Sequence, residues 1–190
     1  AEAKTWAARN VQALAPYAAR GVPIVGTEPS CLLSLRDEYP ELLGSDASRA
    51  VATQAVMLEE LVTRVAAEDP AVRDRFSRGA AGALLLHGHC HQKALTGMDA
   101  TLAALGMIEG ASASLVDSAC CGMAGSFGFE AEHYEISRAM GARTLFPAVA
   151  NAPDADVVIT GVSCRQQIDH FTGRAPRHLA EVLADALGPA

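Results

Sequence analysis

The sequence predicts an α/β fold in which a parallel sheet is flanked by helices. Short apolar runs that indicate strands alternate with longer segments of helical periodicity rich in Ala, Leu and Val. Half of the 190 residues are hydrophobic and only 5% are aromatic, a composition that favours helices packed on a small sheet. One pattern occurs twice, near residues 23–31 and 157–164: a strand, a threonine, two further residues, then Ser-Cys opening a helix. We therefore predict one complete βα cysteine-rich repeat, preceded by the tail of another.

Residues 1–78 are predicted to be a helical segment with one strand, the tail of the first repeat. Helical spacing of apolar residues covers 3–20 and ends at Gly21, and the run 22–25 predicts the strand. A helix is expected from Pro29 to about residue 43, and another over 49–67 with Asp46 or Ser48 as its cap. Residues 68–79 are polar and predict a connector with one short helix.

Residues 79–190 are predicted to be the complete α/β domain. Strands are expected at 83–87, 113–117 and 156–160, the last being the clearest strand pattern in the chain. Helices are expected over 92–105, 130–145 (with Gly141 as a weak point), 163–171 and 176–187. Strands that alternate with helices favour a parallel sheet.

Composition and charge exclude several classes of protein. Fifteen basic residues against 22 acidic ones give a net charge of −7 without a basic cluster, which disfavours nucleic acids and anionic membranes as partners. The longest apolar run, 80–86, is far shorter than the roughly 18 residues of a spanning helix, and no signal peptide is visible. We expect a cytoplasmic protein, free or peripheral at the inner membrane. Motifs for nucleotide binding, zinc proteases and serine hydrolases are absent from the sequence.

The chain has five cysteines: Cys31, Cys90, Cys120, Cys121 and Cys164. Each cysteine, or pair, follows a predicted strand by a few residues, and the carboxyl ends of parallel strands meet at one edge of a sheet. An odd count with two adjacent residues favours metal binding or redox chemistry over a disulfide framework. Iron–sulfur clusters and soft cations need several convergent thiolates, which this layout would supply.

Glycines and histidines accompany the cysteines. Residues 120–128 have a glycine at every third place, and Gly122 and Gly125 would let the backbone approach a bulky group and donate N–H groups to it. An ordinary tight turn is the alternative. The segment 87–91 holds three histidines, of which we expect His89 or His91 beside the metal group without binding the metal. Solvent-facing imidazoles are the alternative, and a Cys-His catalytic pair lacks a third, orienting partner.

Taken together, the motifs resemble the cysteine-rich CCG domain. That domain occurs in one subunit of heterodisulfide reductase, in the iron–sulfur subunit of glycolate oxidase and in one subunit of anaerobic glycerol-3-phosphate dehydrogenase. The resemblance is closer still to the C-terminal region of FAD-linked oxidoreductases of the D-2-hydroxyacid (D-lactate, 2-hydroxyglutarate) type. The segments that carry it are 28–31 with 37–40, 89–95, 120–128, 133–135 and 163–168.

The resemblance implies an electron-transfer domain with an iron–sulfur cluster, of [4Fe–4S] composition, and no catalytic residue of its own. Its expected ligands are Cys90, Cys120, Cys121 and Cys164, with Cys31 as a fifth from the neighbouring repeat. The sequence departs from the family pattern at Gly161 and Glu28, where cysteines would stand. The residues expected around the cofactor are His89, Gly122, Gly125 and Ser163.

The same resemblance implies partners and leaves two alternatives open. Electrons would come from FAD in a dehydrogenase domain or subunit outside this chain and pass to an acceptor protein or a quinone. Four thiolates also satisfy tetrahedral zinc, so a structural or partner-binding module with zinc or no metal is the first alternative. Thiol–disulfide chemistry at Cys120 and Cys121 is the second.

Overall fold

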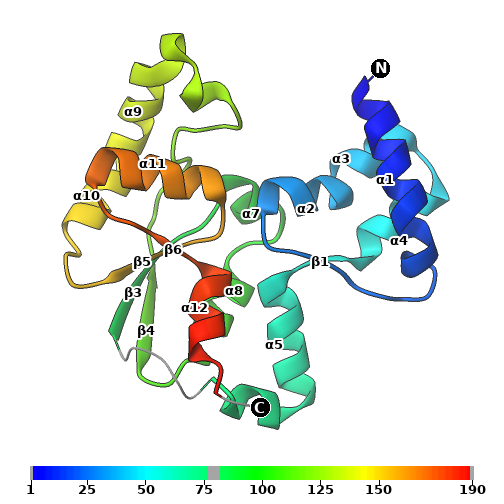
Figure 1. Cartoon of the computed structure of the whole chain (residues 1–190), viewed down its shortest axis with the longest axis horizontal. Helices are drawn as coiled ribbons and strands as arrows, with labels where there is room; N and C mark the ends of the chain where they lie inside the picture. The colour runs from blue at the N-terminus through cyan, green and yellow to red at the C-terminus, as the bar shows by residue number, and fades with distance from the viewer. Residues whose placement is uncertain (1, 77–81, 189–190) are drawn as a thin grey trace. The chain divides into compact units, whose positions relative to one another are not determined.

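The structure, a computed structural model, describes residues 2–76 and 82–188, which fall into two units divided between Leu61 and Val62. Each unit has its own parallel sheet flanked by helices, which confirms the predicted fold class (Figure 1). The predicted boundary between the two repeats, at residues 78 and 79, lies outside the described residues and stays a prediction.

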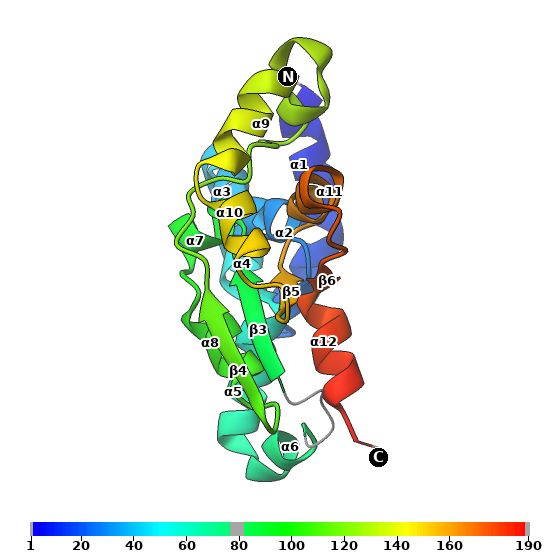
Figure 2. The ribbon, with the colours of Figure 1, turned by 90° about the vertical axis from the view of Figure 1, so that its left-hand side faces the viewer.

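The second unit contains a four-stranded parallel sheet. Its strands are β3 (Gly82–His87), β4 (Ala111–Leu115), β5 (Asp156–Ile159) and β6 (Arg177–His178), in the order β4-β3-β5-β6. Figure 2 shows β3 and β4 side by side. In their parallel register, Leu86 lies opposite Leu115. On the other side of β3, His87 lies opposite Ile159 of β5. The carboxyl ends of these strands therefore share one edge, as the sequence predicted.

Helices cover both faces of this sheet because strand residues alternate between its faces. The helices and turns of the unit are α6 (Pro70–Asp74), α7 (Cys90–Leu95), α8 (Asp99–Leu105), the 3-10 turns Phe127–Phe129 and Ala131–His133, α9 (Tyr134–Ala142), α10 (Leu145–Ala150), α11 (Val162–Thr172) and α12 (Leu179–Ala186). Leu84, Leu86 and Val158 pack with residues of α8 and α12 in one apolar core. Leu85, Val157 and Ile159 pack with residues of α10 and α11 in a second core, which also contains Cys121 and Cys164.

Three predicted helices and one strand of this unit need correction. The predicted helix 92–105 is two helices, α7 and α8, because Gly97 between them has φ +73°, which a helix does not accommodate. The sequence pattern hid this break, because the buried Met98 continues the apolar spacing. The predicted helix 130–145 begins with 3-10 turns and ends at Ala142, and Gly141 gives room to the ring of Phe146. Strand β4 begins two residues before the predicted strand, and β6 precedes α12 where only a helix was predicted.

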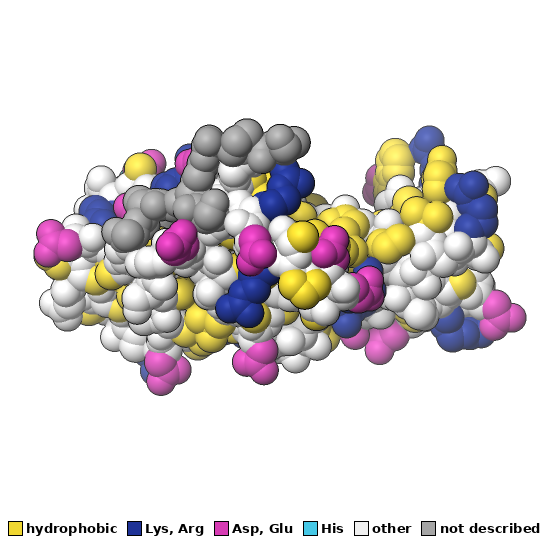
Figure 3. Space-filling view, turned by 90° about the horizontal axis from the view of Figure 1, so that it is seen from below, with side chains coloured by type: hydrophobic (Ala, Val, Ile, Leu, Met, Phe, Trp, Pro, Cys, Tyr) yellow, Lys and Arg dark blue, Asp and Glu magenta, His cyan; other side chains and the backbone are white. Residues whose placement is uncertain are grey.

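On the face drawn in Figure 3, acidic and basic side chains are interspersed. Among the described residues, no helix is both long and apolar enough to cross a membrane.

The first unit is a small helical layer on a two-stranded sheet. It contains α1 (Glu2–Ala18), β1 (Ile24–Gly26), α2 (Pro29–Arg36), α3 (Glu38–Leu43), α4 (Asp46–Gln54), β2 (Ala55–Met57) and the start of α5 (Leu58–Glu68). Strands β1 and β2 pair in parallel. Leu33, Val51 and Met57 are fully buried in its core.

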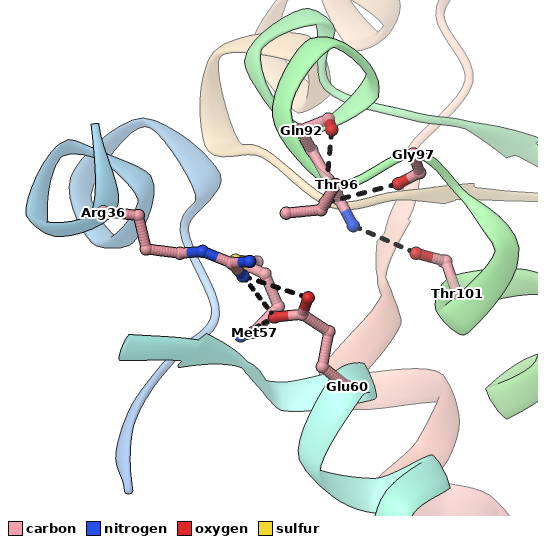
Figure 4. Close-up of polar contacts among 7 residues, drawn as sticks. All are labelled: Arg36, Met57, Glu60, Gln92, Thr96, Gly97 and Thr101. Atoms are coloured by element: carbon pink, nitrogen blue, oxygen red, sulfur yellow. Dashed lines mark hydrogen bonds and ion pairs between the residues drawn. The ribbon is translucent and has the colours of Figure 1, made fainter. Parts of the chain in front are cut away.

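The predicted helix 49–67 was wrong in its middle, because strand β2 separates α4 from α5 there. The apolar spacing continues through the break, since Ala55 and Met57 are buried as strand residues. The Glu60 carboxylate fixes the break: it accepts a hydrogen bond from the Met57 N–H at 2.7 Å and pairs with Arg36 at 2.9 Å (Figure 4). The cap of α4 is Ser45, whose hydroxyl accepts from the Ser48 N–H, so Asp46 and Ser48 were wrong as caps.

The predicted helix from Pro29 to about residue 43 is also two helices in the structure, which meet at Asp37. The cap of α2 is Glu28, whose carboxylate accepts from the Ser30 N–H and hydroxyl.

Candidate metal centre

Four of the five cysteines lie at the carboxyl edge of the second unit's sheet. Cys90 begins α7 after β3, Cys120 and Cys121 lie in the loop after β4, and Cys164 lies in the first turn of α11 after β5. The parallel register of β3 with β4 and β5 brings these three loops together. Cys121 and Cys164 are buried, at 3% and 1% exposure, while Cys90 and Cys120 are half-buried.

The four thiols form a continuous chain of hydrogen-bonding contacts. Cys90 contacts Cys120, Cys120 contacts Cys121, and Cys121 contacts Cys164. Hydrogen bonds from Cys121 and then Cys90 hold the pKa of Cys120 well below its usual range. A hydrogen bond from Cys121 does the same for the pKa of Cys164, and the nearby His87 lowers it further.

The other two thiols behave in the opposite way. Donation to Cys120 is the largest cause that raises the pKa of both Cys90 and Cys121, and burial adds to it. The pKa values of Cys120 and Cys164 are thus lowered, and those of their neighbours Cys90 and Cys121 are raised. A cation at this site would displace the thiol protons and meet four sulfur donors.

Two glycines of the paired-cysteine loop, residues 120–128, adopt conformations that favour glycine. Gly122 has φ +106°, and a Cβ there would lie 2.3 Å from the Ser137 carbonyl oxygen of α9. Its N–H donates to the Cys120 sulfur at 3.3 Å. Gly125 has φ +68° and faces open space. Gly122 thus supplies a backbone donor to a cysteine sulfur, and the roles of Gly122 and Gly125 at a cofactor stay predictions.

Gln167 of α11 ties this loop to α9. The side chain is buried, and its Nε2 lies 2.9 Å from the Cys121 carbonyl oxygen, 3.1 Å from the Ser137 carbonyl oxygen and 3.0 Å from the Ser137 hydroxyl. The position of the Cys121 backbone therefore depends on a side chain one helical turn beyond Cys164.

The histidines of residues 87–91 have different surroundings. His89 caps α7: its Nδ1 accepts from the His91 N–H at 3.3 Å, and its own N–H donates to the Thr160 hydroxyl at 3.0 Å. His87 is 1% exposed, and its Nδ1 lies 2.9 Å from the Ser118 hydroxyl. A ring nitrogen of His87 and the sulfurs of Cys121 and Cys164 all lie within 4.8 Å of one another.

The remaining predicted residues have the following places. Ser163 is half-buried beside Cys164 in α11. Cys31 is exposed on α2 in the first unit, and its role as a fifth ligand stays a prediction. Gly161 and Glu28, at the two positions that depart from the family pattern, are the N-caps of α11 and α2. Each therefore stands three residues before a cysteine and begins its helix.

Sequence reasoning did not single out His87 or Gln167, although periodicity could have found both. Residues of a strand alternate between faces, so His87 shares the face of Leu85, which packs against the core containing Cys121 and Cys164. Gln167 lies three residues after Cys164, which places both on one side of α11.

Comparison with known proteins finds dehydrogenases. Over 188 residues, 98% of this chain, it is 30% identical to one of the subunits of anaerobic glycerol-3-phosphate dehydrogenase from Escherichia coli, and it covers 46% of that subunit. It is also 30% identical to D-2-hydroxyglutarate dehydrogenase of Escherichia coli over 168 residues, and 31% identical to that of Pseudomonas putida over 187. It covers 16% of each of these two proteins.

The chain thus spans about half the length of the first relative and a much smaller part of the others. No family model and no solved structure matches it. The chain is homologous to parts of oxidoreductases, which agrees with the relation to hydroxyacid oxidoreductases that the motifs indicated.

Proposed function

We propose that the chain is the iron–sulfur electron-transfer part of an FAD-linked oxidoreductase. The observation that carries the proposal is the chain of four contacting thiols at the sheet edge, where hydrogen bonds lower the pKa values of Cys120 and Cys164. Their donor chemistry fits a cluster, since iron–sulfur clusters are held by cysteine thiolates. Adjacent Cys120 and Cys121 suit a cluster better than a single small ion, because a cluster offers several metal atoms to neighbouring sulfurs.

The bound cluster would supply storage of single electrons, and the chain's own residues would set how easily it does so. Cys90, Cys120, Cys121 and Cys164 would hold the iron. The Gly122 N–H would donate to sulfur and so favour the reduced form. Burial of Cys121 and Cys164 would exclude water from one side of the site. None of these roles requires a general acid or base.

The dehydrogenase relatives support the partner assignment. We propose that an FAD-binding dehydrogenase domain or subunit oxidises a small hydroxyacid or a glycerol phosphate and passes electrons to this chain. The chain would then pass them to an acceptor protein or a quinone.

The experiment is metal analysis of the whole chain after reconstitution without oxygen. We expect about four irons and four acid-labile sulfides per chain, with visible absorbance that dithionite bleaches. Stoichiometric zinc that iron does not replace would instead establish the structural alternative. A fast-reacting thiol in a chain that binds no metal would establish thiol–disulfide chemistry.

Cys121→Ser tests the ligand set. Serine is close in size and can donate a hydrogen bond to the Cys164 thiolate, so the metal-free variant should fold while it loses the cluster. Far-UV circular dichroism and thermal unfolding check the fold, and full iron content in this variant would contradict the proposal. Cys31→Ser, measured in parallel, decides whether Cys31 is a ligand: unchanged iron content removes it from the set.

A further inference from the structure

We infer that His87 binds the metal group directly through its Nε2 atom, beside the thiolates of Cys121 and Cys164. The inference rests on the proposed function and adds a nitrogen ligand to a site otherwise made of sulfur. It differs from the sequence-based expectation, which placed His89 or His91 near the metal group and no histidine on it.

The first argument is position. His87 is the last residue of β3, at the sheet edge where the cysteine loops meet. A ring nitrogen and the two sulfurs lie within 4.8 Å of one another. Metal–nitrogen and metal–sulfur bonds are about 2.0 and 2.3 Å long, so one metal atom can bridge this spacing after a small adjustment of side chains.

The second argument is the state of the imidazole. His87 is 1% exposed, and within the described residues its Nε2 has no hydrogen-bond partner of ordinary geometry. Buried ring nitrogens are nearly always paired, so this atom needs an explanation. The sulfurs of Cys121 and Cys164 lie close to the same imidazole. A metal atom between nitrogen and sulfur would satisfy both.

The third argument is orientation. Histidines that bind metals donate the other ring N–H to a fixed acceptor, which selects the tautomer and aims the free lone pair. His87 has such a partner in the Ser118 hydroxyl, 2.9 Å from Nδ1. Ser118 is itself held at both backbone atoms, because its N–H donates to the Val116 carbonyl at 2.8 Å and its carbonyl accepts from the Lys93 ammonium.

Charge favours the same assignment. The four thiolates bring negative charge into a site where two of the sulfurs are buried. A neutral imidazole adds a donor without adding charge, and exchange of thiolate for imidazole ligands raises the reduction potential of iron–sulfur centres. We therefore expect His87→Cys to lower the potential.

Spectroscopy on the reconstituted, reduced chain tests the bond itself. With ¹⁵N-histidine labelling, pulsed electron paramagnetic resonance should detect the hyperfine coupling of a directly bound imidazole in the wild type. The coupling should vanish in His87→Gln and persist in His89→Asn, a matched control whose amide oxygen can still cap α7. Coupling that persists in His87→Gln, or that is absent from iron-loaded wild type, overturns the inference and leaves the proposed function standing. A wild type that takes up no iron overturns both.

Co²⁺ titration of the metal-free chain gives a second readout that does not involve activity. We expect affinity about 10–100-fold lower in Ser118→Ala, which removes only the orienting partner, and a loss at least as large in His87→Gln. His87→Cys should recover binding and add sulfur-to-cobalt charge-transfer absorbance, and it decides the matter if His87→Gln does not fold. Wild-type Co²⁺ affinity in folded His87→Gln overturns the inference.

Discussion

Exchange of Gln167 for glutamate tests how the paired-cysteine loop is held in place. Gln167→Glu keeps the shape of the side chain but turns its donor into a carboxylate oxygen, which would face the carbonyl oxygens of Cys121 and Ser137 at about their present distances of 2.9 and 3.1 Å. The Ser137 hydroxyl can rotate and donate to the new carboxylate, so only the two carbonyl oxygens lose their hydrogen bond from residue 167. A buried acceptor without a partner costs about 1–3 kcal/mol, and we therefore expect a loss of about 2–6 kcal/mol in the free energy of unfolding.

Urea unfolding of the metal-free chain at neutral pH measures this loss. Gln166→Glu is the matched control: it makes the same change at an exposed position one residue earlier, where we expect less than about 0.5 kcal/mol. If Gln167→Glu lowers the free energy of unfolding by less than about 1 kcal/mol, this side chain does not hold the paired-cysteine loop in place.

The effect should also depend on pH in a defined direction. Burial and the facing oxygens would raise the pKa of the introduced carboxyl above the value of about 4.3 that it has in the unfolded chain. A group whose pKa is higher in the folded chain stabilises the fold at pH values below its pKa in the unfolded chain, and this stabilisation is lost as the pH rises. The deficit of Gln167→Glu against the wild type should therefore grow between about pH 4 and neutrality. A deficit that shrinks over this range would contradict the assigned geometry.

Three further outcomes are expected. Gly122→Ala should lose about 2–6 kcal/mol of unfolding free energy and most of its iron, because the alanine would have a strained φ and its Cβ would overlap Ser137. Gly125→Ala faces open space and should lose only the about 1–3 kcal/mol that the strained φ costs. Metal binding near neutral pH should release protons in an unbuffered titration, because hydrogen bonds to Cys120 raise the pKa values of Cys90 and Cys121 and burial raises them further; binding without proton release would contradict this direction. Glu60→Gln should destabilise the chain by about 0.5–1.5 kcal/mol in urea, since it weakens the Arg36 pair but keeps an acceptor for the Met57 N–H.

The sheet and the location of the site could be predicted because both depend on strong local signals. Strands β3 and β5 are apolar runs between polar or glycine-containing loops, and a parallel sheet leaves little choice about where their carboxyl ends lie. Helix lengths were overestimated for a physical reason. Buried Met57 and Met98 continue the helical spacing across breaks that are made by strand pairing and by a glycine of positive φ.

Roles within the site were harder to predict because they depend on which neighbour uses each polar atom. In the sequence, His87 and His89 are equivalent histidines two residues apart. In the structure, the Nδ1 of His89 caps the first turn of α7, and the Nδ1 of His87 lies 2.9 Å from the hydroxyl of Ser118, 31 residues along the chain. Only the packing of the loops after β3 and β4 decides between them.

We expect the second unit to fold without a metal. Both faces of its sheet are covered by apolar cores, and hydrogen bonds link the four thiols to one another. Small metal-dependent domains differ, since without metal their cysteines hold little together. In this chain the four sulfurs already lie together, so the loss of one thiol should reduce metal binding far more than stability. Substitutions such as Cys121→Ser therefore report on the metal group, whereas Gln167→Glu reports on the scaffold that places it.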